Sequence, residues 1–182
     1  MAHHHYQPNP KVLSQLSEVD FVAVIGMTAA GKSTLMNEVI RRNPTIHLVR
    51  TTTSRPPRPD ERDGVDYHFR ADEPMRRHMA QGDFVQVAPS VFGPLYATLP
   101  EDYSKDGTSI MAVIAGAMPD FLRLPFKRMR QLYILPPSVE EWRRRVATHG
   151  FDPEQQGRRL AEARASLAYA IACPDVLFIC ND

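Results

Sequence analysis

Four short runs along the chain consist almost entirely of apolar residues. A run of this length without polar alternation is typical of a strand that is buried on both faces, as in a parallel sheet. The first run, FVAVI, follows an acidic residue and is itself followed by glycine. The pattern predicts buried strands over residues 21–25, 109–115, 131–135 and 176–180.

Between these runs the apolar positions repeat with the spacing of a helix. This spacing predicts helices over residues 32–42, 138–148 and 155–172. Buried strands that alternate with helices are typical of an α/β fold with a mostly parallel sheet. The chain is therefore expected to form one α/β core.

Residues 51–98 break the alternation. Their first part, TTTSRPPRPDERDG, is highly charged and has three prolines within four positions, so it cannot be a regular element. We expect a small subdomain inserted between two core segments, residues 20–50 and 99–182. Its predicted elements are strands over residues 67–69 and 84–88 and a helix over residues 72–80.

Charge and composition narrow the classes of function. Lys and Arg total 22 against 21 Asp and Glu, so any positive charge needed for phosphates must be clustered locally. A nucleic-acid partner is not expected, because such proteins more often carry a basic excess. No apolar run approaches the roughly 20 residues of a membrane span, so no membrane partner is expected. The two cysteines have no metal-type spacing.

The start of the chain, MAHHH, looks like the remnant of a purification tag, and we exclude residues 1–5 from functional reasoning. No secretory signal follows this segment, so a cytoplasmic location is expected. The oligomeric state is left open between a monomer and a homodimer.

The first predicted strand leads directly into GMTAAGKS and then into a predicted helix. This order is the context that the phosphate-binding loop requires. Lys32 would bridge the β- and γ-phosphates of ATP, Ser33 would place its hydroxyl on Mg²⁺, and Thr34 would support it. The candidate ATP-binding residues are Gly26, Thr28, Ala29, Ala30, Gly31, Lys32, Ser33 and Thr34.

A second motif lies in the charged part of the insertion. Arg55 and Arg58 stand three residues apart on a loop stiffened by prolines, so they can grip one phosphate from two directions. Tyr67 can add a hydroxyl donor. The alternative interpretation is a solvated charged loop, as most charge-rich turns are.

Here the sequence resembles the guanylate kinase family. TSRPPRPDERDGVDYHF is similar to the family's TTRxPRxGExxGxDYxF, GDFVQVA to GxFLEWA, YAT to YGT, and YILPPSVEE to FIxPPSxEEL. The closing RL, AYA and ND motifs also match, so the similarity spans residues 21–182. It implies a three-layer P-loop NTPase sandwich with a parallel core sheet, an acceptor-binding insertion, and a lid at about residues 146–158.

The resemblance also implies an activity, the transfer of the γ-phosphate of ATP to a purine monophosphate, GMP above all, with Mg²⁺. It implies that Lys32, Arg55, Arg145 and Arg159 are catalytic. The acceptor-binding positions that it implies are Thr51, Arg55, Arg58, Tyr67, Gln86, Tyr96 and Thr98.

The chain departs from the family pattern at several positions. The glutamate that recognises guanine falls on Gln86, and an amide offers one acceptor oxygen and a donor group where a carboxylate offers two acceptor oxygens. The two aspartates of the family's DxD strand fall on Met111 and Val113, and one lid arginine falls on His149. Asp60 or Glu61 would be the acid that compensates near the metal.

Two alternatives stay open at this point. The first keeps the fold and changes the acceptor to another nucleotide, a deoxynucleotide or a sugar phosphate, as in the related ribosyl bisphosphate phosphokinases. The second is a binding module that has lost catalysis. Against the module, the chain retains both loop glycines, the loop lysine and serine, and both acceptor arginines (Gly26, Gly31, Lys32, Ser33, Arg55 and Arg58).

Overall fold

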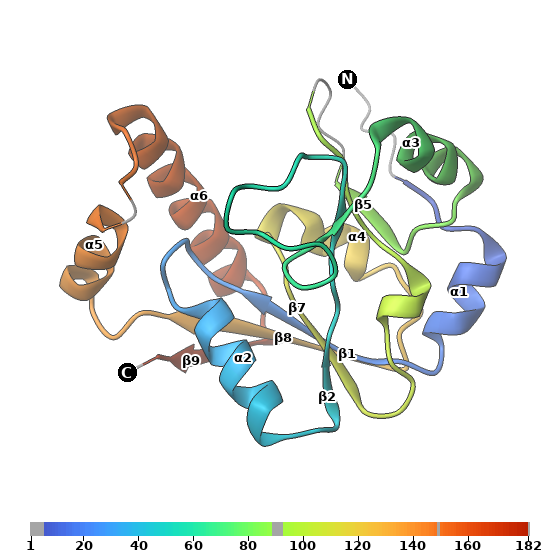
Figure 1. The fold of residues 1–182 in the computed structure, drawn as a ribbon. Coiled ribbons are helices and arrows are strands. Elements are labelled where there is room, and N and C mark those ends of the chain that lie inside the picture. The colour runs from blue at the N-terminus through green and yellow to red at the C-terminus, as the bar shows by residue number, and fades with distance from the viewer. Residues whose placement is uncertain (1–5, 89–92, 149, 182) are drawn as a thin grey trace.

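The structure is a computed structural model that describes residues 6–88, 93–148 and 150–181 (Figure 1). Its central sheet has five strands in the order β2-β7-β1-β8-β9, and every pairing in it is parallel. The strands are β1 (Asp20–Ile25), β2 (Ile46–Leu48), β7 (Thr108–Ala112), β8 (Arg128–Leu135) and β9 (Val176–Cys180).

Helices cover both faces of this sheet. The helices outside the insertion are α1 (Pro10–Leu16), α2 (Lys32–Arg42), α4 (Met118–Phe121), α5 (Val139–Ala147) and α6 (Pro153–Ala172), with two short 3₁₀ helices, η1 (Pro100–Asp102) and η2 (Ala115–Ala117). Because side chains alternate along a strand, β1 contributes to two apolar clusters. Phe21 packs with residues of α1, α4 and α6, whereas Val24 packs with Met36 of α2. The expected three-layer α/β sandwich is therefore confirmed.

The insertion forms a second, smaller sheet of four strands in the order β4-β3-β6-β5. Its elements are β3 (Thr52–Thr53), β4 (His68–Phe69), α3 (Asp72–Gln81), β5 (Gln86–Ala88) and β6 (Tyr96–Thr98). A separate apolar cluster that includes Met75, Phe84 and Leu95 lies beneath it. Figure 1 shows α3 and β5 on the opposite side of the molecule from α5 and α6.

The predicted elements differ from the structure mainly at their ends. The strand predicted over residues 109–115 ends at Ala112, because the chain turns into η2 there. Val113 lies outside the strand, but its side chain is buried in the core, and this burial explains why the apolar run in the sequence extends past the end of the strand. The helix predicted from residue 155 begins at Pro153, where Asp152 and Gln155 form a capping box. The helix therefore takes up the second half of the segment expected to be a lid.

The core also begins earlier than expected. Helix α1 was not predicted, yet its residues Val12 and Leu16 are buried in the main cluster. The structural unit thus starts before residue 20. Among the described residues, no helix combines the length and apolar character needed to span a bilayer. The predicted tag remnant at residues 1–5, His149 and the final Asp182 lie outside the described residues.

Candidate functional site

The loop between β1 and α2 has a backbone that depends on glycine. Gly26 has a φ of 149°, and a Cβ there would lie 2.7 Å from the carbonyl oxygen of Ile134. Gly31 has a φ of 90°, and a Cβ there would overlap the side-chain amide of Asn181. Ala29 also has a positive φ, 63°, although it carries a side chain. For an L-residue this left-handed conformation costs about 1–2 kcal/mol.

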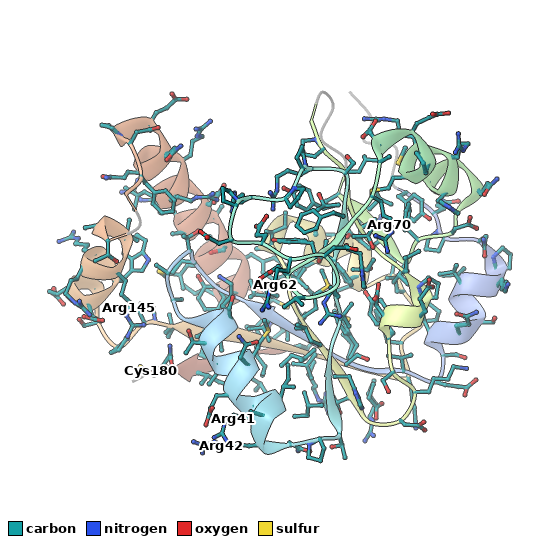
Figure 2. The ribbon with its side chains drawn as sticks, viewed as in Figure 1. Arg41, Arg42, Arg62, Arg70, Arg145 and Cys180 are labelled. Carbon is teal, nitrogen blue, oxygen red and sulfur yellow. The ribbon has the colours of Figure 1, made fainter. Side chains whose placement is uncertain are left out.

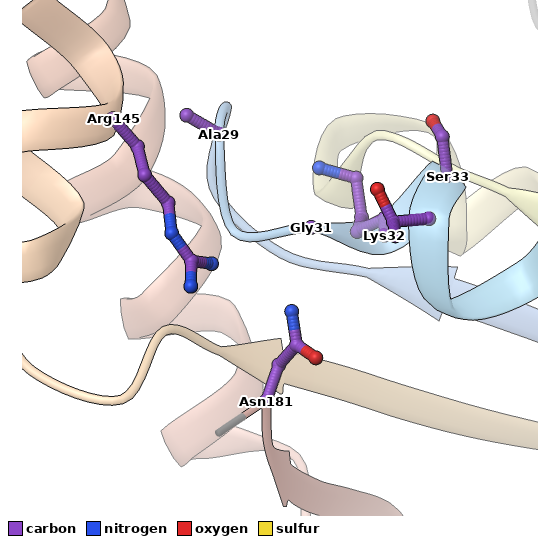
Figure 3. Close-up of a pocket in the computed structure, with 7 residues that line it drawn as sticks. Ala29, Gly31, Lys32, Ser33, Arg145 and Asn181 are labelled. Atoms are coloured by element: carbon purple, nitrogen blue, oxygen red, sulfur yellow. The ribbon is translucent and has the colours of Figure 1, made fainter.

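A cleft of about 520 Å³ opens over this loop (Figure 3). The N-terminus of α2 borders the cleft, and a helix N-terminus favours anions such as phosphate. In Figure 3 the side chains of Arg145, from α5, and Asn181, which follows β9, extend toward each other beside the loop. The residues that line the cleft are Ala29, Gly31, Lys32, Ser33, Thr34, Arg145 and Asn181.

Lys32 is partly buried where the loop meets α2. Its ammonium group donates hydrogen bonds to the carbonyl oxygens of Gly26 and Met27, at 2.7 and 2.9 Å. Burial lowers the pKa of Lys32 to about 8, because desolvation disfavours the charged form. A bound phosphate would favour that charged form again.

Two further loop carbonyls accept hydrogen bonds from distant side chains. The indole N–H of Trp142, on α5, donates to the carbonyl oxygen of Thr28 at 2.8 Å. The side-chain amide of Asn181 donates to the carbonyl oxygen of Ala30 at 3.0 Å. Neither Trp142 nor Asn181 was assigned to the site from the sequence. The sequence did contain a signal for Asn181. This residue directly follows the strand predicted over residues 176–180, and the carboxyl ends of parallel strands meet at one edge of the sheet.

A second cavity, of about 340 Å³, lies between the loop, the end of β7 and helix α6. Lys32 lines this cavity as well as the first, and Arg159 lines it from α6. The end of β7 contributes no acid here: Val113 lines the cavity, while Met111 packs against the core. The carboxylate present is that of Glu162, which binds Arg159 at 2.8 Å.

Arg145 is the other arginine that the resemblance implicates. Its Nε donates to Glu141, one helical turn earlier, at 2.7 Å. Hydrogen bonds from Arg144 and Arg145 hold the pKa of Glu141 at about 2, so the carboxylate stays ionised. Other arginines lie elsewhere: Figure 2 shows Arg41 and Arg42 at the opposite end of α2 from the loop.

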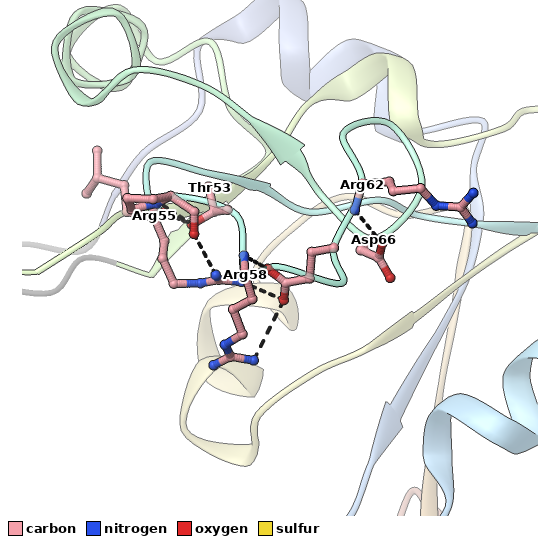
Figure 4. A network of polar contacts seen from close by, with 8 residues as sticks. Thr53, Arg55, Arg58, Arg62 and Asp66 are labelled. Atoms are coloured by element: carbon pink, nitrogen blue, oxygen red, sulfur yellow. Dashed lines mark hydrogen bonds and ion pairs between the residues drawn. The ribbon is translucent and has the colours of Figure 1, made fainter.

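Glu61 joins Arg55 and Arg58 (Figure 4). Both of its carboxylate oxygens lie 2.8 Å from the guanidinium of Arg55. It also accepts the backbone N–H of Arg58 at 2.8 Å, which is the main cause of its lowered pKa. Glu61 is therefore bound to the arginines of the insertion, not set aside for a metal as one expectation had it. In Figure 4 the side chain of Arg62 extends away from both arginines.

Aromatic rings surround Arg55. Its guanidinium lies 5.5 Å from the ring centre of Tyr67 and 5.7 Å from that of Phe69. Tyr96 stands edge-on to Tyr67, with the ring centres 6.3 Å apart. The structure thus brings together four of the predicted acceptor residues, Arg55, Arg58, Tyr67 and Tyr96. The Nε of Arg55 is buried without a partner in the described structure.

The remaining predicted acceptor residues are arranged differently. Gln86 and Thr98 are buried and stand directly opposite each other on β5 and β6. The hydroxyl of Thr98 lies 3.0 Å from that of the buried Tyr103. Thr51 precedes β3, and its carbonyl accepts the N–H of His68 at 2.9 Å.

A divalent cation has few side-chain ligands available. Within the described residues, no three His, Cys, Asp or Glu side chains gather in a way that could hold a metal ion. Ser33 is exposed on the wall of the larger cleft. Its hydroxyl can serve as a single oxygen ligand.

Comparisons with known proteins point to one family. The family model described as guanylate kinase matches residues 19–181. A guanylate kinase of Alkalilimnicola ehrlichii is 35% identical over an alignment of 153 residues, and the match covers 78% of this chain and 71% of that protein. A guanylate kinase of Paraburkholderia xenovorans is 37% identical over an alignment of 152 residues, and the match covers 81% of this chain and 67% of that protein.

A solved structure agrees on the fold. The crystal structure of guanylate kinase from Anaplasma phagocytophilum matches with a TM-score of 0.64 at 23% sequence identity. The match covers 90% of this chain and 77% of that one.

Proposed function

The chain belongs to the guanylate kinase family, the ATP-dependent kinases that phosphorylate GMP, and we propose how its own residues divide this work. The donor ATP binds in the cleft over the loop, and the acceptor GMP binds against the insertion. Phosphoryl transfer of this kind depends on positioning and charge neutralisation more than on covalent chemistry by the protein.

On the donor side, the backbone N–H groups of the loop and the N-terminus of α2 hold the β- and γ-phosphates. Lys32 exchanges its two carbonyl partners for phosphate oxygens. The observation that carries the proposal is the position of Lys32 on the walls of both cavities, one lined by Arg145 and the other by Arg159. Three cationic side chains thus converge where charge develops on the transferred group.

Mg²⁺ fits this donor side with Ser33 as its single protein ligand. Mg²⁺ usually keeps several waters and takes the rest of its ligands from substrate phosphates, so one hydroxyl meets its needs. When bound, the ion neutralises charge on the phosphate oxygens. Glu162 is already paired with Arg159, so we do not count it as a ligand.

On the acceptor side, Arg55 and Arg58 hold the phosphate of GMP, with the hydroxyls of Tyr67 and Tyr96 as further donors. Bidentate arginine contacts fix the direction of that phosphate and so align its attacking oxygen. Gln86 and Thr98 face the base from the smaller sheet, and Thr51 contributes from the start of β3. The amide of Gln86 can accept one hydrogen bond from guanine where a carboxylate would accept two.

Closure over both substrates excludes water and suppresses ATP hydrolysis. We assign this role to the segment of about residues 146–158, which joins α5 to α6 and so links Arg145 with Arg159. The proposal further includes a cytoplasmic location and an oligomeric state of either monomer or homodimer. Sedimentation measures the oligomeric state.

A coupled ADP-release assay with ATP and Mg²⁺ tests the proposal. The acceptors to compare are GMP, dGMP, AMP, dAMP, CMP, UMP and dTMP, and GMP should give the highest kcat/KM. Turnover with another nucleotide and none with GMP would replace the acceptor. Lys32→Ala should lower kcat/KM by about 10²–10³-fold. The exposed Lys11, changed to Ala in the same way, serves as its control.

A further inference from the structure

Four carbonyl oxygens of the loop accept hydrogen bonds from side chains. Lys32 holds those of Gly26 and Met27, Trp142 holds that of Thr28, and Asn181 holds that of Ala30. Two of these donors are far from their acceptors in the sequence: Trp142 by 114 residues and Asn181 by 151 residues.

These bonds fix the direction of the loop's N–H groups. A trans peptide is planar, so the carbonyl of one residue and the N–H of the next point in opposite directions. By holding the carbonyl of Thr28, Trp142 sets the direction of the N–H of Ala29. By holding the carbonyl of Ala30, Asn181 sets that of Gly31. Ala29 and Gly31 both line the cleft.

The peptide between Thr28 and Ala29 needs such a restraint. Ala29 has a φ of 63°, and it is the non-glycine residue with positive φ among the described residues. A flip of this peptide would change that φ and relieve the strain on the alanine. The same flip would turn the carbonyl of Thr28 toward the cleft and the N–H of Ala29 away from it. Phosphate would then meet an acceptor instead of a donor.

We propose that Trp142 is a positioning residue for the donor phosphates, whose indole N–H locks the strained Thr28–Ala29 peptide with the N–H of Ala29 toward the cleft. The inference deepens the proposed function and rests on its assignment of this loop to ATP. The ring of Trp142 has a second, separate role in packing, because it lines an apolar pocket of about 420 Å³ together with Val139 and Leu160. The polar and apolar roles can therefore be separated by substitution.

Trp142→Phe keeps an aromatic ring and removes only the donor. We expect its KM for ATP to rise about 10-fold, the effect of one hydrogen bond at this site. The KM for GMP should stay within a factor of two. ADP binding measured by calorimetry should weaken by the same factor as the KM for ATP. Val139→Ala is the matched control, because Val139 lines the same pocket without contacting a loop carbonyl.

The sharper test is rescue at a second position. Glycine adopts positive φ at no steric cost, so in Ala29→Gly the peptide has no strain to relieve by flipping. Adding Ala29→Gly to Trp142→Phe should therefore restore most of the lost ATP affinity. A merely structural role for the indole ring would not be repaired by a substitution in the loop.

The outcomes separate this inference from the proposed function. An unchanged KM for ATP in Trp142→Phe, or no rescue by Ala29→Gly, overturns the inference. Lys32→Ala is measured alongside: if it still binds ADP as the wild type does, the loop assignment itself is wrong. If Trp142→Phe fails to fold, Ala29→Gly alone decides. Its melting temperature should stay equal or rise, and a fall of several degrees would show that Ala29 is not strained.

Discussion

Glu61 sets the geometry of the acceptor arginines at the scale of a single side chain. Its carboxylate binds the guanidinium of Arg55 and the backbone N–H of Arg58 at the same time. In Glu61→Gln the negative charge is lost and one acceptor oxygen becomes an NH₂ donor, so the guanidinium of Arg55 loses its ion pair and one of its two acceptors. We expect the KM for GMP to rise about 10-fold, with the KM for ATP unchanged, in steady-state assays.

The exposed neighbour Asp60 provides the control, and Asp60→Asn should behave as the wild type. The pKa of Glu61 is lowered, so its carboxylate is ionised at neutral pH. Its contribution is therefore complete at neutral pH and is lost only as the pH falls through the lowered value. Equal loss of affinity for both substrates would contradict this role.

Gln86 tests how the base is recognised. It is 7% exposed, directly across from Thr98 on the neighbouring strand. Gln86→Glu should lower the KM for GMP about 10-fold, because a carboxylate can accept from both the N1–H and the 2-amino group of guanine. The KM for AMP should not fall. Burial of the new charge should lower the melting temperature of the free protein, and added GMP should restore it.

Gln81, exposed at the end of α3, gives the matched substitution Gln81→Glu. It adds the same charge to the same subdomain away from the smaller sheet. A KM for GMP that is the same in both variants and the wild type would exclude Gln86 from base recognition.

At the scale of elements, β8 and α6 are joined by a buried polar contact. The hydroxyl of Tyr133, a fully buried residue, lies 3.0 Å from that of Ser166, which also donates to the carbonyl of Ala163. Tyr133→Phe should cost about 1 kcal/mol of unfolding free energy, since Ser166 keeps its other partner. For a domain of this size the melting temperature should fall by roughly 2–4 °C.

A double-mutant cycle checks whether the contact is the cause. Ser166→Ala added to Tyr133→Phe should lower stability by less than it does alone, because the two hydroxyls share one hydrogen bond. Fully additive losses would assign the effect to packing instead. The KM for ATP should not change in either variant.

At the scale of the whole molecule, the segment before α1 connects the core to the insertion. The hydroxyl of Tyr6 donates to the carbonyl of Phe84 at 2.9 Å and accepts from its N–H at 2.8 Å. Tyr6→Phe leaves both backbone groups of Phe84 without this partner, at a cost of about 1–3 kcal/mol. Hydrogen exchange should accelerate at residues 84–88 and not in the central sheet, whereas Gln7→Ala should change neither.

The sequence predicted the elements that are long or strongly apolar. The bounds of α2 and β9 were predicted exactly as observed, because a helical period and a buried run are local signals. The strands β2, β3 and β6 have two or three residues each, too few for alternation to be recognised. Helix α1 escaped because its place in the core depends on distant partners.

The same distinction holds for the candidate site. The loop and the arginine motif are contiguous, so their residue types and spacing could be recognised in the sequence. The bonds from Trp142 and Asn181 join residues far apart in the chain, and no local pattern encodes them. The sequence suggested a role near the metal for Glu61. That Glu61 instead binds Arg55 and Arg58 depends on side-chain geometry, which the sequence does not show.

The strand order also determines when, during synthesis of the chain, each strand can pair with its neighbours. Strand β1 lies between β7 and β8, and its Asp20 binds Arg128, which is 108 residues later. At roughly 5–20 residues per second, a ribosome needs roughly 5 to 20 s to add that intervening stretch. For most of this time the apolar strand DFVAVI has neither of its neighbours, because β7 begins only at Thr108. The central strand that leads into the glycine loop is thus also a segment of the nascent chain that depends on protection from aggregation.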